Sequence, residues 1–384
     1  MKNKNCIRAF VKGNLGDDLF IHILCGRYPQ ERFVICGEKK YAKAFEGITN
    51  LTYISRDSFW NKWFFRLINI PIWVINKVYQ VRGVKRECPY YRIFEHVSRH
   101  SKNNILISGS IFMELTDVPF VVNGYYRNEE KYYQLGPHVI GCNFGPYIND
   151  TFKEFYSRMF RKARYVCFRE QKSYEMFDGE NIHYAPDIVF THIVQNQTTI
   201  IKDHVLLSVM NVEKDGQQNP KLREVYVREM VLLIEKLQKQ GEKIILLGFC
   251  QEQKDDDVIL NILEHLQNQT NVQSYCYPEI GYEDALQLFQ GAKSVVATRY
   301  HAMILGWLYG CQVLPVIYSD KMLNVINDLA PDTGYVKVDE LDGSGVVYKM
   351  FEKMREDACI WDVSDAVAKA QMNFQSLDRL FNNK

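Results

Sequence analysis

The stretch CIRAFVKGNLGDD, residues 6–18, decides the fold class of this chain. Its first half, residues 6–11, is mostly apolar and predicts a buried strand, and the glycines that follow predict a tight turn into a helix that begins near Asp18. Strands that alternate with helices in this way build parallel sheets with helices on both faces. The opening of the chain therefore predicts a doubly wound α/β fold.

The same alternation continues along the chain and predicts two domains. Further strands are expected at residues 32–36, 104–108, 138–142, 165–168, 204–210, 243–249, 272–275, 294–298 and 312–317. We expect an N-terminal domain at 1–195 on the acceptor side, a C-terminal domain at 196–345 on the donor-binding side, and a polar linker at 195–199. Helices at 346–384 are expected to pack back across the first domain. Two doubly wound, Rossmann-like domains facing across a cleft form the glycosyltransferase-B-like arrangement.

Composition and charge exclude several classes of protein. The chain is 47% hydrophobic, and its 47 Lys and Arg against 46 Asp and Glu give a net charge of +1, so no global field attracts nucleic acid. No apolar run reaches the roughly 18 residues that a membrane span needs, and the N-terminus lacks the pattern of a secretory signal, which favours a cytoplasmic protein. The ten cysteines form no C-x-x-C pair, so we expect free thiols and no metal site.

The turn after the first strand is the first candidate for chemistry. Gly13 and Gly16 permit close approach of the backbone to a ligand, and Asn14 lies between them at the start of a helix. Asp17 and Asp18 have two interpretations. They cap the helix and complement its dipole, or one of them acts as a base toward a substrate hydroxyl.

The tetrapeptide TRYH at residues 298–301 follows a predicted strand and opens a helix. Arg299 can grip a carboxylate or a phosphate, Tyr300 accompanies it, and His301 can donate or accept a proton near neutral pH. The structural alternatives are that Arg299 pairs with an acidic side chain and that His301 caps the helix.

Arg169 repeats this arrangement in the first domain, after the strand at 165–168. Facing Arg299 across a cleft, it would form half of an anion clamp, unless Glu170 neutralises it. Asn143, at the end of another strand, is expected to line the same opening. Lys321 is either a third cation for a phosphate or a solvated residue at a helix start.

Taken together, these residues resemble the polysaccharide pyruvyl transferase family, from Gly13 to about Lys321. The shared motifs are GNxGDD at 13–18, Arg169-Glu170 with Ser173, Pro186-Asp187, Arg299-x-His301 and Tyr318-x-x-Lys321. The family often has Gly-x-Pro after the histidine helix, whereas this chain has Gly310-Cys311-Gln312. Asp187 follows a proline and is expected to be a turn or positioning residue.

The resemblance implies transfer of pyruvyl from phosphoenolpyruvate to two hydroxyls of a sugar in a surface-polysaccharide precursor, which forms a cyclic ketal and releases phosphate. Arg169, Arg299 and Lys321 would hold the carboxylate and phosphate of the donor. His301 would protonate the methylene carbon, and Asp17 or Asp18 would accept a hydroxyl proton. No step calls for a cofactor or a metal.

Two alternatives and one segment remain open. The chain could be a sugar-nucleotide-dependent glycosyltransferase of the same architecture, or a binding protein that has lost catalysis. Residues 58–81 carry aromatic side chains at helical spacing, and residues 77–102 are rich in Lys and Arg. This insertion, 58–102, is either a core-facing helix with a solvated basic surface or a peripheral contact with anionic lipid and a lipid-linked acceptor at the inner face of the membrane.

Overall fold

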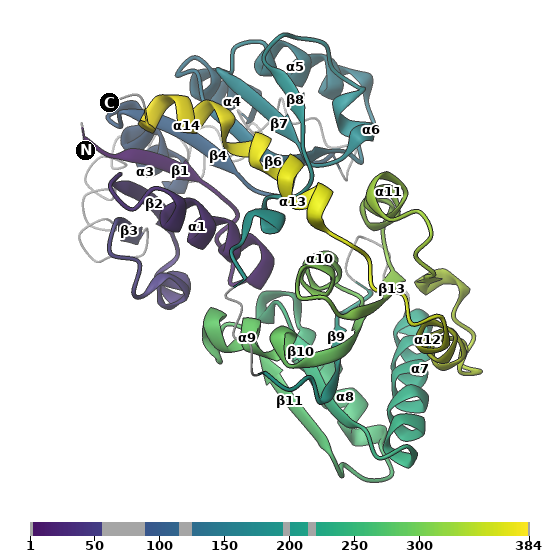
Figure 1. The fold of residues 1–384 in the computed structure, drawn as a ribbon. Coiled ribbons are helices and arrows are strands. Elements are labelled where there is room, and N and C mark those ends of the chain that lie inside the picture. Colours follow the sequence, from purple (N-terminus) through teal and green to yellow (C-terminus); the bar gives the residue numbers. More distant parts are fainter. Residues whose placement is uncertain (1–2, 56–88, 115–124, 195–199, 214–219, 383–384) are drawn as a thin grey trace, which may run out of the picture. The chain divides into compact units, whose positions relative to one another are not determined.

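The computed structural model describes residues 3–55, 89–114, 125–194, 200–213 and 220–382, which form two compact α/β units (Figure 1). The first unit comprises Met1–Lys12, Phe20–Ala185 and Met372–Lys384. The second unit comprises Gly13–Leu19 and Pro186–Gln371.

The first unit contains a parallel sheet with the order β3-β2-β1-β4-β6-β7-β8, and β5 pairs with β6. The strands are β1 (Asn5–Arg8), β2 (Phe33–Gly37), β3 (Leu51–Ser55), β4 (Asn103–Ile107), β5 (Ser110–Phe112), β6 (His138–Phe144), β7 (Tyr165–Phe168) and β8 (Ile182–Tyr184). The direction of winding reverses between β1 and β4, where Ile7 pairs with Ile105. Ligands of such sheets bind near this reversal, at the carboxyl ends of the strands.

Aromatic side chains dominate the core of the first unit. Its helices are α1 (Leu15–Arg27), whose first residues belong to the second unit, α3 (Pro89–Arg99), α4 (Tyr125–Tyr133), α5 (Asp150–Phe160), α6 (Gln171–Tyr174) and α14 (Gln375–Asn382). Phe144 on β6 packs against Tyr156 and Phe160 on α5, with ring centroids 5.9 and 6.3 Å apart. Such edge-to-face pairs contribute about 0.5–1.5 kcal/mol each beyond the buried area. They fix α5 against the sheet.

The second unit contains a parallel sheet with the order β11-β10-β9-β12-β13-β14. The strands are β9 (His204–Val209), β10 (Lys243–Gly248), β11 (Val272–Cys276), β12 (Ala292–Ala297), β13 (Gln312–Ile317) and β14 (Val336–Lys337). This is the order of a Rossmann fold, and the reversal lies between β9 and β12. The carboxyl ends of these two strands are therefore the expected ligand-binding edge.

Helices cover both faces of this sheet (Figure 1). They are α7 (Pro220–Lys239), α8 (Asp255–His265), α9 (Gly281–Gln290), α10 (Tyr300–Leu308), α11 (Asp320–Leu329), α12 (Val346–Asp357) and α13 (Ser364–Ala370). Leu233 on α7, Ile262 on α8 and Phe351 on α12 share one aliphatic core with Leu246 of β10. Because both faces are covered, the strands consist of nearly continuous apolar residues.

The borders of the units differ from the expected borders in three places. The second unit resumes at Pro186, whereas we expected the border at the polar run 195–199. That run lies outside the described residues. The short helix Ile188–Thr191 is buried and contacts α10. Gly13–Leu19 also belongs to the second unit, because the Leu15 N–H donates to the carbonyl of Phe249 at 3.1 Å.

The C-terminal helices divide between the units, whereas we expected all of them to pack on the first. α12 packs on α7, where buried Glu229 accepts hydrogen bonds from the N–H groups of Gly345 and Val347 at 2.9 and 3.1 Å. The end of the chain, Met372–Lys384, packs on the first unit. There the ring centroids of Phe381, on α14, and Tyr28 are 4.9 Å apart, and Asp378 pairs with Arg27 at 2.8 Å. The carboxylate of Glu229 holds the start of α12 in the second unit.

The ten expected strands are all present, with ends shifted by up to three residues. Four strands were not expected: β3, β5, β8 and β14. Among them β5, β8 and β14 have only 3, 3 and 2 residues, which is too short for a periodic pattern. Most of the aromatic and basic insertion, residues 56–88, lies outside the described residues.

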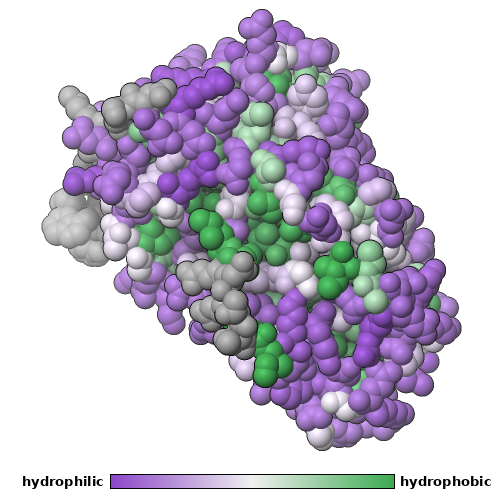
Figure 2. Space-filling view, in the orientation of Figure 1, coloured by the Kyte–Doolittle hydropathy of each residue, from purple (hydrophilic) through white to green (hydrophobic). Residues whose placement is uncertain are grey.

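Within the described chain, no helix combines the length and the apolar character that a membrane crossing requires. Figure 2 shows that the face of the molecule in view carries mainly hydrophilic residues. In the described end of the basic segment, Arg99 pairs with Glu95 at 2.8 Å.

Candidate active site

His301 lies in the first turn of α10, directly after β12, at the carboxyl edge of the second sheet. Its side chain is nearly buried, and its Nε2 lies 3.7 Å from Oδ2 of Asp187. Asp187 is 1% exposed, and its other oxygen accepts the N–H of Val189 at 2.8 Å. That bond fixes the carboxylate of Asp187 beside the imidazole, so Asp187 is placed to orient the ring.

Gly16 lies against the other side of the His301 ring. A Cβ on Gly16 would lie 1.8 Å from Nδ1 of His301, so only glycine permits this approach. Asn14 directly precedes α1, and its side-chain oxygen accepts the Gly16 N–H at 3.0 Å. The backbone of Asn14 also forms an isolated β-bridge with that of Cys250, after β10. Asn14 and Gly16, both predicted to bind substrate, therefore lie at the start of α1, where Gly16 adjoins the histidine.

Asp18 is fully buried on α1, and its Oδ2 accepts the hydroxyl of Tyr277 at 2.9 Å. Its other oxygen has no hydrogen-bond partner in the described chain. Burial raises the pKa of Asp18 well above its ordinary value, and the charge of Asp17 adds to the effect, although the bond from Tyr277 opposes it. Asp18 is therefore protonated more readily than an ordinary aspartate, whereas its neighbour Asp17 is only half-buried.

Arg299 precedes α10 and pairs with buried Asp255 at the start of α8. Its Nε donates to Oδ2 of Asp255 at 3.0 Å, its Nη2 bonds to Oδ1, and its Nη1 bonds to Gln253. Asp255 also accepts the N–H groups of Phe249 and Cys250, at 3.1 and 3.0 Å. Burial alone would lower the pKa of Arg299, but Asp255 raises it. The structure thus provides the acidic partner that the sequence left as an alternative.

Arg169 follows β7 in the first unit and is 3% exposed. Its Nη2 donates to Oδ1 of Asn143 at 2.8 Å and to the hydroxyl of Ser110 at 3.3 Å. Gly109 also lies against the guanidinium, because a Cβ there would lie 2.8 Å from Nη1. Glu170 accepts the hydroxyl of Ser173 at 2.6 Å. Arg169 and Asn143, both predicted site residues, therefore lie together at the carboxyl edge of the first sheet.

The remaining predicted residues also lie in the second unit. Tyr300 is buried, and its ring meets that of His301 edge-on at 5.0 Å. Lys321 is in the first turn of α11, with its amine 5.0 Å from the ring centre of Tyr318. Gly13 has a positive φ of 63°, which supports the turn into α1.

Two residues of this site were missed in the sequence analysis, Asp255 and Tyr277. Asp255 opens the acidic run DDD at 255–257, directly after a strand, which is a signal for a helix start but not for an arginine partner. Tyr277 follows β11 and carries no local signal.

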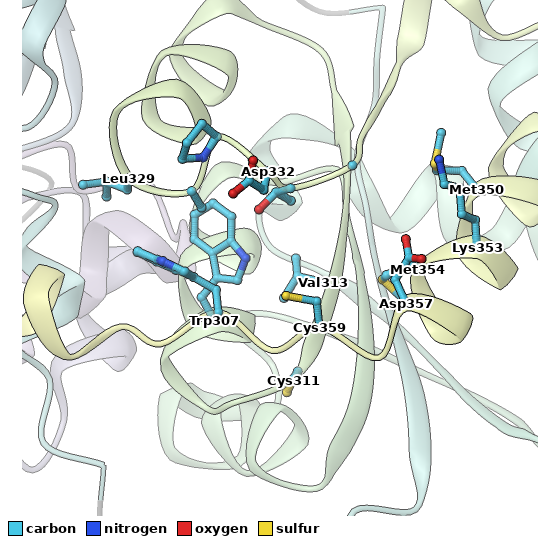
Figure 3. Close-up of a pocket in the computed structure, with 15 residues that line it drawn as sticks. Trp307, Cys311, Val313, Leu329, Asp332, Met350, Lys353, Met354, Asp357 and Cys359 are labelled. Atoms are coloured by element: carbon cyan, nitrogen blue, oxygen red, sulfur yellow. The ribbon is translucent and has the colours of Figure 1, made fainter.

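A cavity of about 490 Å³ lies at the opposite end of α10 (Figure 3). Trp307 and Val313 line it, together with Met350 and Met354 of α12. Trp307 is near the end of the helix that His301 begins, so this cavity is separate from the histidine site. Among the described residues, no group of three or more His, Cys, Asp or Glu side chains is arranged to hold a metal ion.

Solved structures with similar folds define the class. HepE from Anabaena, in complex with UDP and glucose, has a TM-score of 0.52 at 12% identity, with 100% of both chains covered. UDP-GlcNAc 2-epimerase from Methanocaldococcus jannaschii has a TM-score of 0.53 at 10% identity, also with 100% of both chains covered. The trehalose-6-phosphate synthase OtsA has a TM-score of 0.50 at 9% identity, with 97% of this chain and 96% of that chain covered. At these identities the likeness shows the fold alone, which is two Rossmann-like sheets of glycosyltransferase-B type.

The family model of the polysaccharide pyruvyl transferases matches residues 14–320. The chain belongs to this family, as the motifs predicted. A comparison with curated protein sequences found no match.

Proposed function

We propose that this protein transfers pyruvyl from phosphoenolpyruvate to two hydroxyls of a saccharide, forms a ketal and releases phosphate. The observation that carries the proposal is the His301 imidazole, held between the carboxylate of Asp187 and the start of α1 at Gly16. A protonated imidazole in this position is suited to protonate the methylene carbon of the donor. Protonation makes the neighbouring carbon electrophilic, so that a sugar hydroxyl can attack it.

The two negative groups of the donor need cationic partners. In the second unit, the N–H groups of Arg299 that Asp255 and Gln253 do not use, together with the N-terminus of α10, favour an anion. In the first unit, Arg169 donates to Asn143 and Ser110 at the carboxyl edge of its own sheet. We propose Arg169 as an anion-binding residue of the first unit because ligands of parallel sheets bind at this edge.

The base that accepts the hydroxyl proton is Asp17 in this proposal. Asp18 was the other candidate, but its carboxyl is fully buried and already accepts the hydroxyl of Tyr277. Asp17 is half-buried on the same turn of α1. Once phosphate has left, the second sugar hydroxyl closes the ketal ring.

The test is phosphate release from phosphoenolpyruvate in the presence of galactosides, mannosides and glucosides. We expect release that depends on the saccharide, a product heavier by the mass of pyruvic acid minus water, and near-complete loss in His301→Ala with an unchanged melting temperature. Release of a nucleoside diphosphate from a sugar nucleotide would instead identify a glycosyltransferase. Full turnover by His301→Ala would reject the role of the histidine.

A further inference from the structure

A second cavity, of about 410 Å³, opens at the carboxyl ends of β9, β13 and β14 in the second unit. β13 is the neighbour of β12, which leads into Arg299 and His301, so the cavity and the histidine share one edge of the sheet. Tyr318, in the wall of the cavity, interacts electrostatically with Arg299. Ligands of open parallel sheets bind along this edge, and the volume lies in the range of about 300–1,000 Å³ typical of small-molecule sites.

The first polar group of this cavity is the hydroxyl of Ser319. Ser319 precedes α11, where a serine normally caps the helix, but its side chain forms no capping bond. Its oxygen is buried and has no hydrogen-bond partner in the described chain. A buried polar atom without a partner is unfavourable, and a ligand that bonds to Ser319 would remove that penalty.

The polar lining also includes two carboxylates, Asp320 and Asp339, and the amine of Lys337. Neither carboxylate forms an ion pair with any residue in the described ranges. Lys337 lies 3.7 Å from Glu340. Carboxylates without a cationic partner accept hydrogen bonds from hydroxyl groups, so the lining favours a ligand rich in hydroxyl donors.

The rest of the lining is apolar, with Met210, Leu222, Ile317 and Val338 among its members. Sugars combine hydroxyl edges with C–H faces, so a sugar can bond to the carboxylates and pack its C–H face on these side chains. We propose that this cavity binds a sugar unit of the acceptor next to the unit that receives pyruvyl. This inference rests on the proposed function. It assigns part of the enzyme's specificity for its acceptor to the residues that line this cavity.

Direct binding tests the cavity without any turnover. The probes are lactose, cellobiose and mannobiose, compared with the methyl glycosides of their component sugars, in saturation-transfer NMR and calorimetric titration. We expect at least one disaccharide to bind, and its Kd to rise about tenfold or more in Asp339→Asn, since a hydrogen bond to a charged group is lost. Ser319→Ala should weaken binding without lowering the melting temperature, because its hydroxyl caps no helix. Asp332→Asn is the matched control, because Asp332 is an exposed carboxylate in the other cavity.

Turnover separates the failure of this inference from the failure of the proposed function. We expect Asp339→Asn to lower kcat/KM for the disaccharide about tenfold while kcat/KM for the methyl glycoside stays within about twofold of wild type. If Asp339→Asn leaves the ratio of kcat/KM for the disaccharide to kcat/KM for the methyl glycoside unchanged, the cavity assignment is overturned and the proposed function still stands. Disaccharide binding that is sensitive to Asp339, without any phosphoenolpyruvate-dependent turnover, would overturn the proposed function alone. Binding of uridine or inorganic phosphate but of no saccharide would overturn the sugar assignment.

Discussion

The substitution Gly16→Ala tests the contact that holds His301. Its added Cβ would lie 1.8 Å from Nδ1 and 2.3 Å from Cγ of the imidazole, whereas ordinary van der Waals contact begins at 3.4 Å. Relief of the closest contact requires a displacement of about 1.6 Å, the difference between 3.4 and 1.8 Å. A misplacement of about 1 Å can cost about 100-fold in rate, so we expect kcat to fall by about that factor or more. Overpacking should lower the free energy of unfolding by about 1–3 kcal/mol.

Gly26→Ala is the matched control because Gly26 lies on the same helix, α1, and an added Cβ meets no atom within 4 Å. Alanine favours a helix over glycine, so this variant should keep its activity and be as stable as wild type or more stable, by up to about 1 kcal/mol. The assays are phosphate release from phosphoenolpyruvate and urea denaturation. A Gly16→Ala enzyme with kcat within about threefold of wild type would refute the argument that only glycine fits beside His301.

Three further substitutions test the partners that the structure reveals. Asp187→Asn keeps the shape of the side chain but removes its charge, so kcat for phosphate release should fall about tenfold or more, and unchanged turnover would contradict the role of Asp187. Asp255→Ala leaves Arg299 buried without its partner and should lower the free energy of unfolding by about 3–5 kcal/mol. A loss below about 1 kcal/mol, measured by urea denaturation, would contradict the stabilising role of this ion pair. Asp18→Asn mimics the neutral carboxyl. A raised pKa means that the folded protein holds a proton at Asp18 that the unfolded chain releases above about pH 4. The free energy of unfolding of wild type, relative to that of this variant, should therefore fall as pH rises, by up to about 1.4 kcal/mol per pH unit. A difference that stays constant between pH 4 and 7 would contradict a raised pKa.

Much of the candidate site could be placed from the sequence. Arg299 and His301 follow a predicted strand, and Gly16 with Asp18 follows another, so both groups were expected at the carboxyl edges of sheets, where the structure has them. The motif pattern also predicted the family. Local signals suffice for such placements because a strand, its turn and the following helix are contiguous in the chain.

The partners of these residues could not be predicted in the same way. Arg299 bonds to Asp255, 44 positions away, and Asp18 bonds to Tyr277, 259 positions away. Nothing in the local pattern around Asp255 separates a helix-capping acid from the partner of an arginine. The same limit applies to the burial of Asp18, which raises its pKa and depends on residues distant in the chain.

The sequence alone determined the strands and their alternation with helices, because continuous burial on both faces demands runs of apolar residues that remain visible one strand at a time. Only the tertiary structure decided which charged groups neutralise one another and which carboxyl has its pKa raised by burial. It also decided that α12 and α13 belong to the second unit while α14 packs on the first. Those outcomes depend on distances and burial between segments far apart in the chain. Electrostatic energies and desolvation costs vary steeply with the distance between charged groups and with their burial. These energies therefore take definite values only once the chain has folded.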